Sequence, residues 1–216
     1  MLRLIIETSN LDFQLGLHSS GDGGEGGSGF VFRSDQHDGS AELTAMLADG
    51  LSKAGKDIAD IGEIVVDLGP GGLTSTRSGI AFANGLAFAR DIKIVGVNSM
   101  DLMVLQAGCE PQDHVIAARR SNDGNYFMGF FSNGTCHRLA LGKPLELINE
   151  QGWQGKTLTW IGPYPKTWAD QPPELDVNFN ALLSPGLDAF DILLATDAFG
   201  QLPRVDAAGP MNETIR

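Results

Sequence analysis

The chain is poor in the residues that most often build metal and disulfide sites. Its 216 residues include only two cysteines, Cys109 and Cys136, and four histidines. The cysteines lack the C-x-x-C and C-x-H spacings of zinc sites and redox motifs, and the histidines are scattered without a ligand spacing. We therefore expect two reduced thiols and no bound metal, which suits a protein of the cytoplasm.

Long apolar runs are also missing from the sequence. The run at residues 2–6 ends at Glu7, which makes it too short for the core of a signal peptide. No later run approaches the roughly 20 apolar residues that cross a bilayer. The sequence therefore predicts a soluble protein that is neither exported nor bound to a membrane.

Basic side chains are scarce relative to acidic ones. The chain has 15 Lys and Arg against 27 Asp and Glu, a formal net charge of -12, and its only adjacent basic pair is Arg119 and Arg120. A surface of this charge repels a polyanion unless basic residues cluster strongly. We expect that the chain does not bind RNA or DNA tightly by itself.

The first half of the chain alternates short apolar runs with helical patterns. Expected strands lie at residues 2–6, 13–18, 30–33, 63–67 and 93–97, and expected helices at 41–54, 73–90 and 99–107. Ser40 is the expected N-cap of the first helix. We assign no chemistry to the glycine-rich segment at 21–29. The order of these elements predicts an α/β fold with a mixed sheet and helices packed on it.

The second half has a different sequence pattern, which predicts shorter strands and more turns. Expected strands lie at residues 114–119, 126–131, 136–140 and 157–161, and an alanine-rich helical stretch at 187–199. We therefore predict two lobes, a regular one at 1–108 and a smaller, less regular one at 109–216.

The turn Gly69–Gly72 joins a buried strand to the most informative helix, residues 73–90, whose only charges are Arg77 and Arg90. One interpretation is that Gly69, Gly71 and Gly72 expose backbone amides that bind an anion at the helix N-terminus. A second is that these glycines let the strand pack closely on the helix, and a third is that the turn contacts a partner directly. The turn matches neither the P-loop nor the G-x-G-x-x-G pattern, because it lacks the lysine and the third glycine.

Polar residues at the strand ends leave two interpretations open. Glu7, Thr8 and Asp67 either lie near a phosphate or metal or bond to their own loops. Arg77, a cation about one turn into the helix, opposes the helix dipole, which indicates an acidic partner. That partner is either within the chain, with Asp67 as a candidate, or on another chain.

The helices at 41–54 and 73–90 carry more apolar surface than one sheet needs. We expect one face of each helix to cover the sheet and the other to contact a second subunit, although burial in the chain's own core is the alternative. The predicted contact residues are Leu43, Met46, Leu47, Arg77, Ile80, Ala81, Asn84, Gly85 and Phe88.

The element order, starting from residues 5–9 (IIETS), resembles the first half of the actin, sugar kinase and Hsp70 (ASKHA) superfamily, whose core is ribonuclease H-like. Within it, residues 69–71 (GPG) followed by Thr74, Arg77 and Gly79 resemble the corresponding stretch of the TsaB (YeaZ) family. The continuation at 85–87 and 94–99 is also similar to that family.

The resemblance implies a two-lobe ASKHA fold and a part in the synthesis of threonylcarbamoyladenosine in tRNA. It implies a non-catalytic scaffold or activating subunit that pairs with a TsaD-type transferase, is assisted by a TsaE-type ATPase and forms a homodimer when alone. Transfer RNA would be bound through the complex, and ATP would be used by the partners. No cofactor of the chain's own is expected, although weak nucleotide contact at Glu7, Thr8 and the glycine turn stays open.

The related TsaD family carries an H-x-x-x-H metal pair after the equivalent strand, where this chain has Ser99 and Met103. Neither replaces a histidine as a metal ligand, so the resemblance is to the partner without metal. The alternative function is a stand-alone ATP-dependent kinase or acyl-phosphate enzyme that uses Glu7 and the glycine turn. A peptidase is favoured least, since the sequence has no Gly-x-Ser-x-Gly nucleophile pattern.

Overall fold

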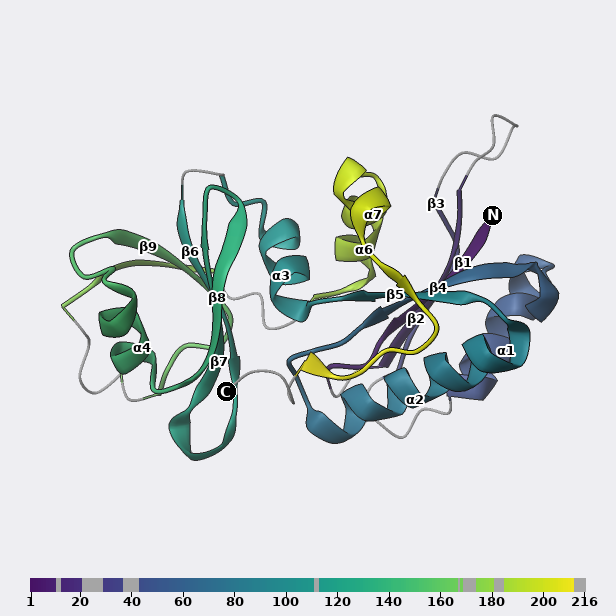
Figure 1. Ribbon diagram of the computed structural model, residues 1–216, viewed down its shortest axis with the longest axis horizontal. Helices are drawn as coiled ribbons and strands as arrows, with labels where there is room; N and C mark the ends of the chain where they lie inside the picture. Colours follow the sequence, from purple (N-terminus) through teal and green to yellow (C-terminus); the bar gives the residue numbers. More distant parts are fainter. Residues whose placement is uncertain are drawn as a thin grey trace. The chain divides into compact units, whose positions relative to one another are not determined.

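The computed structural model describes residues 1–10, 13–20, 29–36, 43–110, 113–166, 168, 174–180 and 185–211. The chain forms two compact units. The first contains Met1–Ser99 together with Gly186–Met211, and the second contains Met100–Pro185. Each unit is built on its own β-sheet (Figure 1). The predicted α/β class with two mixed sheets and flanking helices is confirmed.

The sheet of the first unit has six strands in the order β11-β5-β4-β1-β2-β3. Its strands are β1 (Leu2–Glu7), β2 (Phe13–Ser19), β3 (Gly29–Gln36), β4 (Ile61–Asp67), β5 (Lys93–Val97) and β11 (Arg204–Val205). Strands β1, β4 and β5 are parallel, while β2 and β3 continue the sheet as antiparallel strands. Strands β1 and β4 are buried at almost every position, which requires cover on both faces of the sheet.

Helices supply that cover on both faces of the first sheet. Helices α1 (Leu43–Ala54) and α2 (Leu73–Arg90) share one core with the even-numbered residues of β1, such as Leu4 and Ile6. Helix α6 (Leu187–Leu194) packs on β1, β2 and β3, and α7 (Asp197–Gln201) follows it. Figure 1 shows α6 and α7 on one side of this sheet and α2 on the other.

The second unit has a five-stranded sheet in the order β10-β9-β6-β7-β8. Its strands are β6 (His114–Arg120), β7 (Tyr126–Ser132), β8 (Thr135–Gly142), β9 (Thr157–Ile161) and β10 (Asp176–Asn180). Helix α4 (Pro144–Gln151) packs with Ile116 and Ala118 of β6, and α3 (Ser99–Ala107) packs with Val115 and Ala117. Because side chains alternate along a strand, α3 and α4 cover opposite faces.

The predicted bounds of α2, β5, α3 and β9 are confirmed, but the C-terminal helical stretch needs correction. Residues 187–199 form two helices, because the Thr196 side chain accepts a hydrogen bond from the Phe199 amide and starts α7 anew. The stretch also belongs to the first unit, whereas the predicted boundary between 108 and 109 assigned it to the second lobe. Its apolar residues Phe190 and Leu193 are buried on the face of the first sheet that α1 and α2 do not cover.

Three elements of the structure, α4, β10 and β11, were not predicted from the sequence. Two short 3-10 segments, Ile58–Asp60 and Asn122–Gly124, complete the described elements. The predicted cap at Ser40 and the glycine-rich segment up to residue 28 lie outside the described residues. Within the part of the chain that the structure covers, no helix combines the length and apolarity needed to cross a bilayer.

Candidate functional site

The turn between β4 and α2 is held from inside the protein by Asp67. This carboxylate is fully buried and accepts a hydrogen bond from the Gly69 amide at 2.8 Å. Both of its oxygens lie 2.7 Å from the Ser99 hydroxyl, which donates to them. The Ser99 amide in turn donates to the Gly69 carbonyl at 2.8 Å. Asp67 therefore ties the glycine turn to the start of α3, a structural role.

The glycines of the turn lie directly against the residues that follow β1. A Cβ on Gly71 would lie 2.2 Å from the Ser9 carbonyl oxygen, and a Cβ on Gly79 would lie 2.0 Å from the Thr8 hydroxyl. The Gly72 amide, at the N-terminus of α2, donates to the Ser9 carbonyl at 2.7 Å. These contacts support the close-packing interpretation of the turn, because that amide already has a partner within the chain.

Glu7 and Thr8 lie fully buried beside the same turn. The Glu7 carboxylate accepts hydrogen bonds from the Ser9 amide at 2.9 Å, from the Ser9 hydroxyl and from the Asn10 side chain at 3.4 Å. The Thr8 hydroxyl and the Thr76 hydroxyl are buried without a hydrogen-bond partner among the described residues. The structure thus brings Glu7 and Thr8 together with the glycine turn, and a nucleotide contact there stays a prediction.

Four of the predicted partner-contact residues lie in the core of the first unit. Leu43, Met46 and Leu47 of α1 and Ile80 of α2 are buried in the cluster that these helices share with the sheet. Their placement on a partner surface is therefore wrong in this structure. Their apolar side chains repeat at helical spacing on the face that covers the sheet, so the alternative of core burial holds for them.

The opposite side of α2 is exposed. We call the exposed stripe Thr74, Arg77, Ser78, Ala81, Gly85 and Phe88 the outer face of α2. These residues recur at intervals of three and four, which places them along one side of the helix. The Phe88 side chain is 90% exposed, and a Cβ on Gly85 would meet nothing within 4 Å. The outer face of α2 thus combines small residues with one charged side chain, Arg77, and one large apolar side chain, Phe88.

Asn84 has a different role from the one that the sequence suggested. It is half-buried, its side-chain amide donates to the Ala208 carbonyl at 3.0 Å, and its oxygen accepts from the Ala208 amide at 2.9 Å. Both bonds tie the chain after β11 to α2. Asn84 therefore binds the chain's own C-terminal segment.

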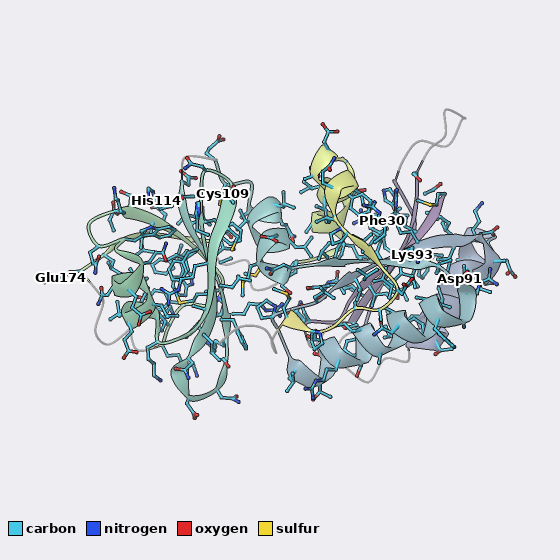
Figure 2. All side chains as sticks on the ribbon, viewed as in Figure 1. Phe30, Asp91, Lys93, Cys109, His114 and Glu174 are labelled. Atoms are coloured by element: carbon cyan, nitrogen blue, oxygen red, sulfur yellow. The ribbon has the colours of Figure 1, made fainter. Side chains whose placement is uncertain are left out.

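Neither thiol has the environment of a nucleophile. Burial raises the pKa of Cys136 to about 11, and burial together with the nearby Asp113 raises the pKa of Cys109 (Figure 2). A raised pKa keeps a thiol protonated at neutral pH and lowers its reactivity. Ser99 and Met103 are fully buried, and no group of three or more metal-binding side chains gathers within the described ranges.

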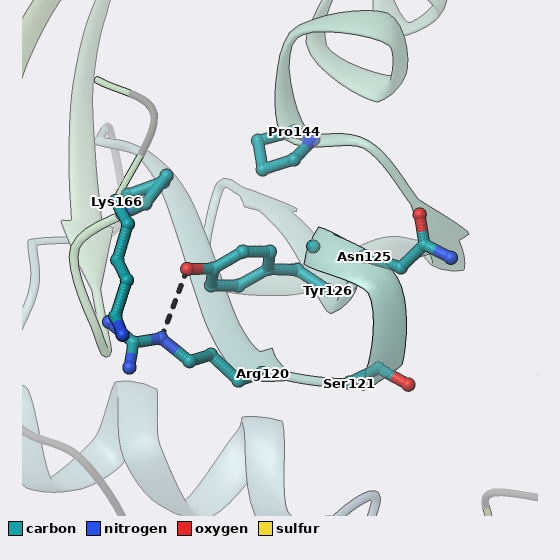
Figure 3. Close-up of a pocket in the computed structure, with 8 residues that line it drawn as sticks. Arg120, Ser121, Asn125, Tyr126, Pro144 and Lys166 are labelled. Carbon is teal, nitrogen blue, oxygen red and sulfur yellow. Dashed lines mark hydrogen bonds between the residues drawn. The ribbon is translucent and has the colours of Figure 1, made fainter. Parts of the chain in front are cut away.

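The sequence reading missed a pocket of about 230 Å³ in the second unit (Figure 3). It is lined by Arg120, Ser121, Gly124, Asn125, Tyr126, Pro144, Pro165 and Lys166. The only signal in the sequence was the basic pair Arg119 and Arg120 beside a turn-rich segment. Lys166 is 46 positions further along the chain, and no pattern links it to Arg120.

Comparisons with known proteins point to one pathway. Residues 26–123 match the family model described as TsaD, tRNA N6-adenosine threonylcarbamoyltransferase. A relative from Escherichia coli K12, the tRNA threonylcarbamoyladenosine biosynthesis protein TsaB, is 28% identical over 183 residues, which cover 78% of each chain.

The matches to full-length transferases are short. The tRNA N6-adenosine threonylcarbamoyltransferase of Nitratidesulfovibrio vulgaris DP4 is 43% identical over 60 residues, which cover 28% of this chain and 17% of that protein. Among solved structures, YeaZ from Pseudomonas aeruginosa superposes with a TM-score of 0.67 at 21% identity. That match covers 97% of this chain and all of the other. The structural likeness shows the fold, and it extends over both units.

Proposed function

We propose that the chain serves tRNA threonylcarbamoyladenosine biosynthesis as a member of the TsaB (YeaZ) family, a non-catalytic subunit that binds and activates a TsaD-type transferase. The biosynthetic role follows from the relative in E. coli, whose match spans most of both chains. The pairing and the absence of catalysis by this chain are the proposed part.

The observation that carries the proposed pairing is the outer face of α2. The inner side of this helix is already covered by the sheet, yet the outer face presents Phe88 almost fully to solvent. Small residues at Ala81 and Gly85 let another helix approach closely. Burial of such a surface against an apolar side of another subunit is favourable in free energy, because it removes the Phe88 ring from water. In the absence of the transferase, the same face would join two copies of this chain.

The contacts at the glycine turn support a subunit without its own catalysis. Glu7 and Asp67, the two carboxylates at the strand ends, bond to their own loops. The turn is packed against Thr8 and Ser9. No observation at the turn therefore favours the alternative function of a stand-alone kinase. Elevated thiol pKa values speak against a cysteine peptidase.

The net charge is consistent with a cytoplasmic complex in which other subunits bind tRNA and use ATP. At -12, the chain as a whole repels a polyanion, so tRNA would be held by the transferase and ATP used by a TsaE-type ATPase. This chain would contribute a surface that stabilises the active arrangement of its partner.

An arginine on the outer face of α2 tests the pairing. Ala81→Arg and Gly85→Arg should each reduce co-purification with a TsaD-type transferase by at least about tenfold, because a charge buried without a partner costs several kcal/mol. Both positions are exposed, and space is open around Gly85, so the fold should persist. Circular dichroism and thermal melting of each variant check that it does.

Ala198→Arg is the matched control for this experiment. Ala198 is exposed on α7, which covers the opposite side of the sheet, so the same change of size and charge should leave the complex intact. If folded Ala81→Arg and Gly85→Arg proteins still bind the transferase as the unaltered chain does, the proposed pairing is wrong.

A further inference from the structure

We propose that the second unit binds a small phosphate-bearing ligand in the pocket between the β6–β7 turn, the start of α4 and the segment after β9. This site is separate from the outer face of α2 and does not depend on the proposed pairing. It is defined by the eight lining residues and a volume of about 230 Å³. That volume is below the range of pockets that enclose a whole drug-sized ligand, so the pocket would hold the phosphate and the group next to it, and the rest of a larger ligand would extend beyond it.

Positive charge is concentrated in this pocket against the trend of the whole chain. Arg120 and Lys166 line it, and none of the lining residues that the structure describes is acidic. Acidic side chains outnumber basic ones in the chain by 27 to 15. Neither Arg120 nor Lys166 forms an ion pair within the described residues, so two like charges share one pocket. An anion between them would remove their mutual repulsion.

The guanidinium of Arg120 is held in place by neutral groups. Its Nε donates to the Tyr126 hydroxyl at 3.2 Å, and its Nη2 donates to the Tyr164 carbonyl at 3.0 Å. Figure 3 shows the first of these bonds across the pocket. These contacts orient the guanidinium without neutralising it, and its other N–H groups stay able to donate. A planar donor that is oriented in advance suits the oxygens of a phosphate.

Two further polar side chains complete the lining. The Ser121 hydroxyl and the Asn125 side-chain amide make no hydrogen bond within the described part of the chain. Beside the lining residue Gly124, the ammonium of Lys143 donates to the Asp123 carbonyl. A phosphate in the pocket would thus meet hydroxyl and amide donors as well as positive charge, the mixture that such groups require.

An apolar wall gives the site a place for the organic part of the ligand. The Tyr126 ring lies between Pro144 and Arg120 in Figure 3, and Pro165 completes this wall. Tyr126 is itself buried and packs edge-on against Trp160, with 5.9 Å between ring centroids. The wall is therefore rigid, and it favours a phosphate ester over bare phosphate.

A titration of the full chain followed by amide NMR signals tests the site. Inorganic phosphate and AMP should each produce saturable shifts at Ser121 and Asn125, and AMP should bind more tightly because of the apolar wall. Lys166→Met should weaken AMP binding by about fivefold, the loss expected for one exposed charge contact. Lys156→Met is the matched control, since Lys156 is also exposed in this unit but does not line the pocket.

A short RNA oligonucleotide distinguishes the source of the phosphate. Tighter binding of AMP would identify the ligand as a free metabolite, and tighter binding of the oligonucleotide would identify it as an RNA backbone. Either result supports the proposed site. Equal weakening by Lys166→Met and Lys156→Met would overturn the proposal. Identical shifts from sodium chloride at matched ionic strength would also overturn it, because they would show a general salt effect.

Discussion

The two sides of α2 have similar composition and opposite surroundings. The inner side buries Thr76, Gly79, Ile80, Ala83 and Ala87 against the first sheet. The outer face of α2 is equally rich in small residues, yet it is exposed and carries Phe88. Composition alone therefore does not identify a partner surface on this helix. The position of a residue around the helix axis decides whether it faces the sheet or another molecule.

Two glycines of α2 show this difference most clearly. Gly79 lies against Thr8, where a Cβ would come within 2.0 Å of the hydroxyl oxygen. Gly85, six residues later, has nothing within 4 Å of the same added atom. One glycine is required by packing inside the chain, and the other leaves room for something outside it.

The largest expected effect follows from Gly79→Ala. Thr8 is fully buried and β-branched, so it has little freedom to move away from a new methyl group. Overpacking costs about 1–3 kcal/mol, and the gain in helix propensity offsets up to about 1 kcal/mol of it. We expect the free energy of unfolding, measured by urea denaturation, to fall by about 1–2 kcal/mol. An unchanged or higher value would contradict the described packing.

Gly85→Ala should change the stability in the opposite direction. Here the added methyl group meets open space, so only the helix propensity changes. We expect the free energy of unfolding to rise by about 0.5–1 kcal/mol in the same urea measurement. A loss of stability would show that the isolated chain already has a neighbour packed at Gly85. A homodimer through the outer face of α2 is the first candidate, and sedimentation of both proteins would detect it.

A smaller effect is expected on the other face of the sheet, where α6 packs on β1, β2 and β3. Burial lowers the pKa of His18 from its ordinary value of 6.5, and Arg3 and Arg33 lower it further. Asp191, 3.5 Å away, raises it and only partly compensates. Because the folded protein holds the neutral imidazole, the unfolded chain binds the proton more readily. Stability should therefore fall as the pH drops below 6.5.

His18→Leu provides the control for this pH dependence. The His18 ring packs edge-on against Phe30 at 5.3 Å between centroids, so an apolar side chain suits its surroundings. The variant should lose the part of the decline that begins near pH 6.5, while the decline due to carboxylates at lower pH remains. Identical pH profiles for both proteins would show that His18 does not titrate as described.

The sequence was sufficient for the elements with strong local signals. The bounds of α2 were predicted because a glycine turn opens the helix and the apolar pattern ends at Arg90. The division of its residues between core and surface was not, since small apolar residues occur all round the helix. Ile80 and Ala81 are neighbours in the sequence, and only the sheet determines which of them is buried.

Features that depend on distant segments could not be predicted. The helical pattern at 187–199 was visible, but its packing on the first sheet joins residues separated by most of the chain. The phosphate-binding pocket likewise combines the end of β6, the start of α4 and Lys166, each of which looks ordinary by itself. Helix α4 was missed because its eight residues give too short a pattern to recognise.

Hydroxyl-radical footprinting of the unaltered chain, alone and with a TsaD-type transferase, tests the central claim most directly. Phe88 is 90% exposed and Phe179, on β10 of the second unit, is 47% exposed, so the two rings have the same chemistry and both react in the isolated chain. The account predicts that the transferase protects Phe88 strongly and leaves Phe179 reactive. Equal oxidation of Phe88 with and without bound transferase would contradict it.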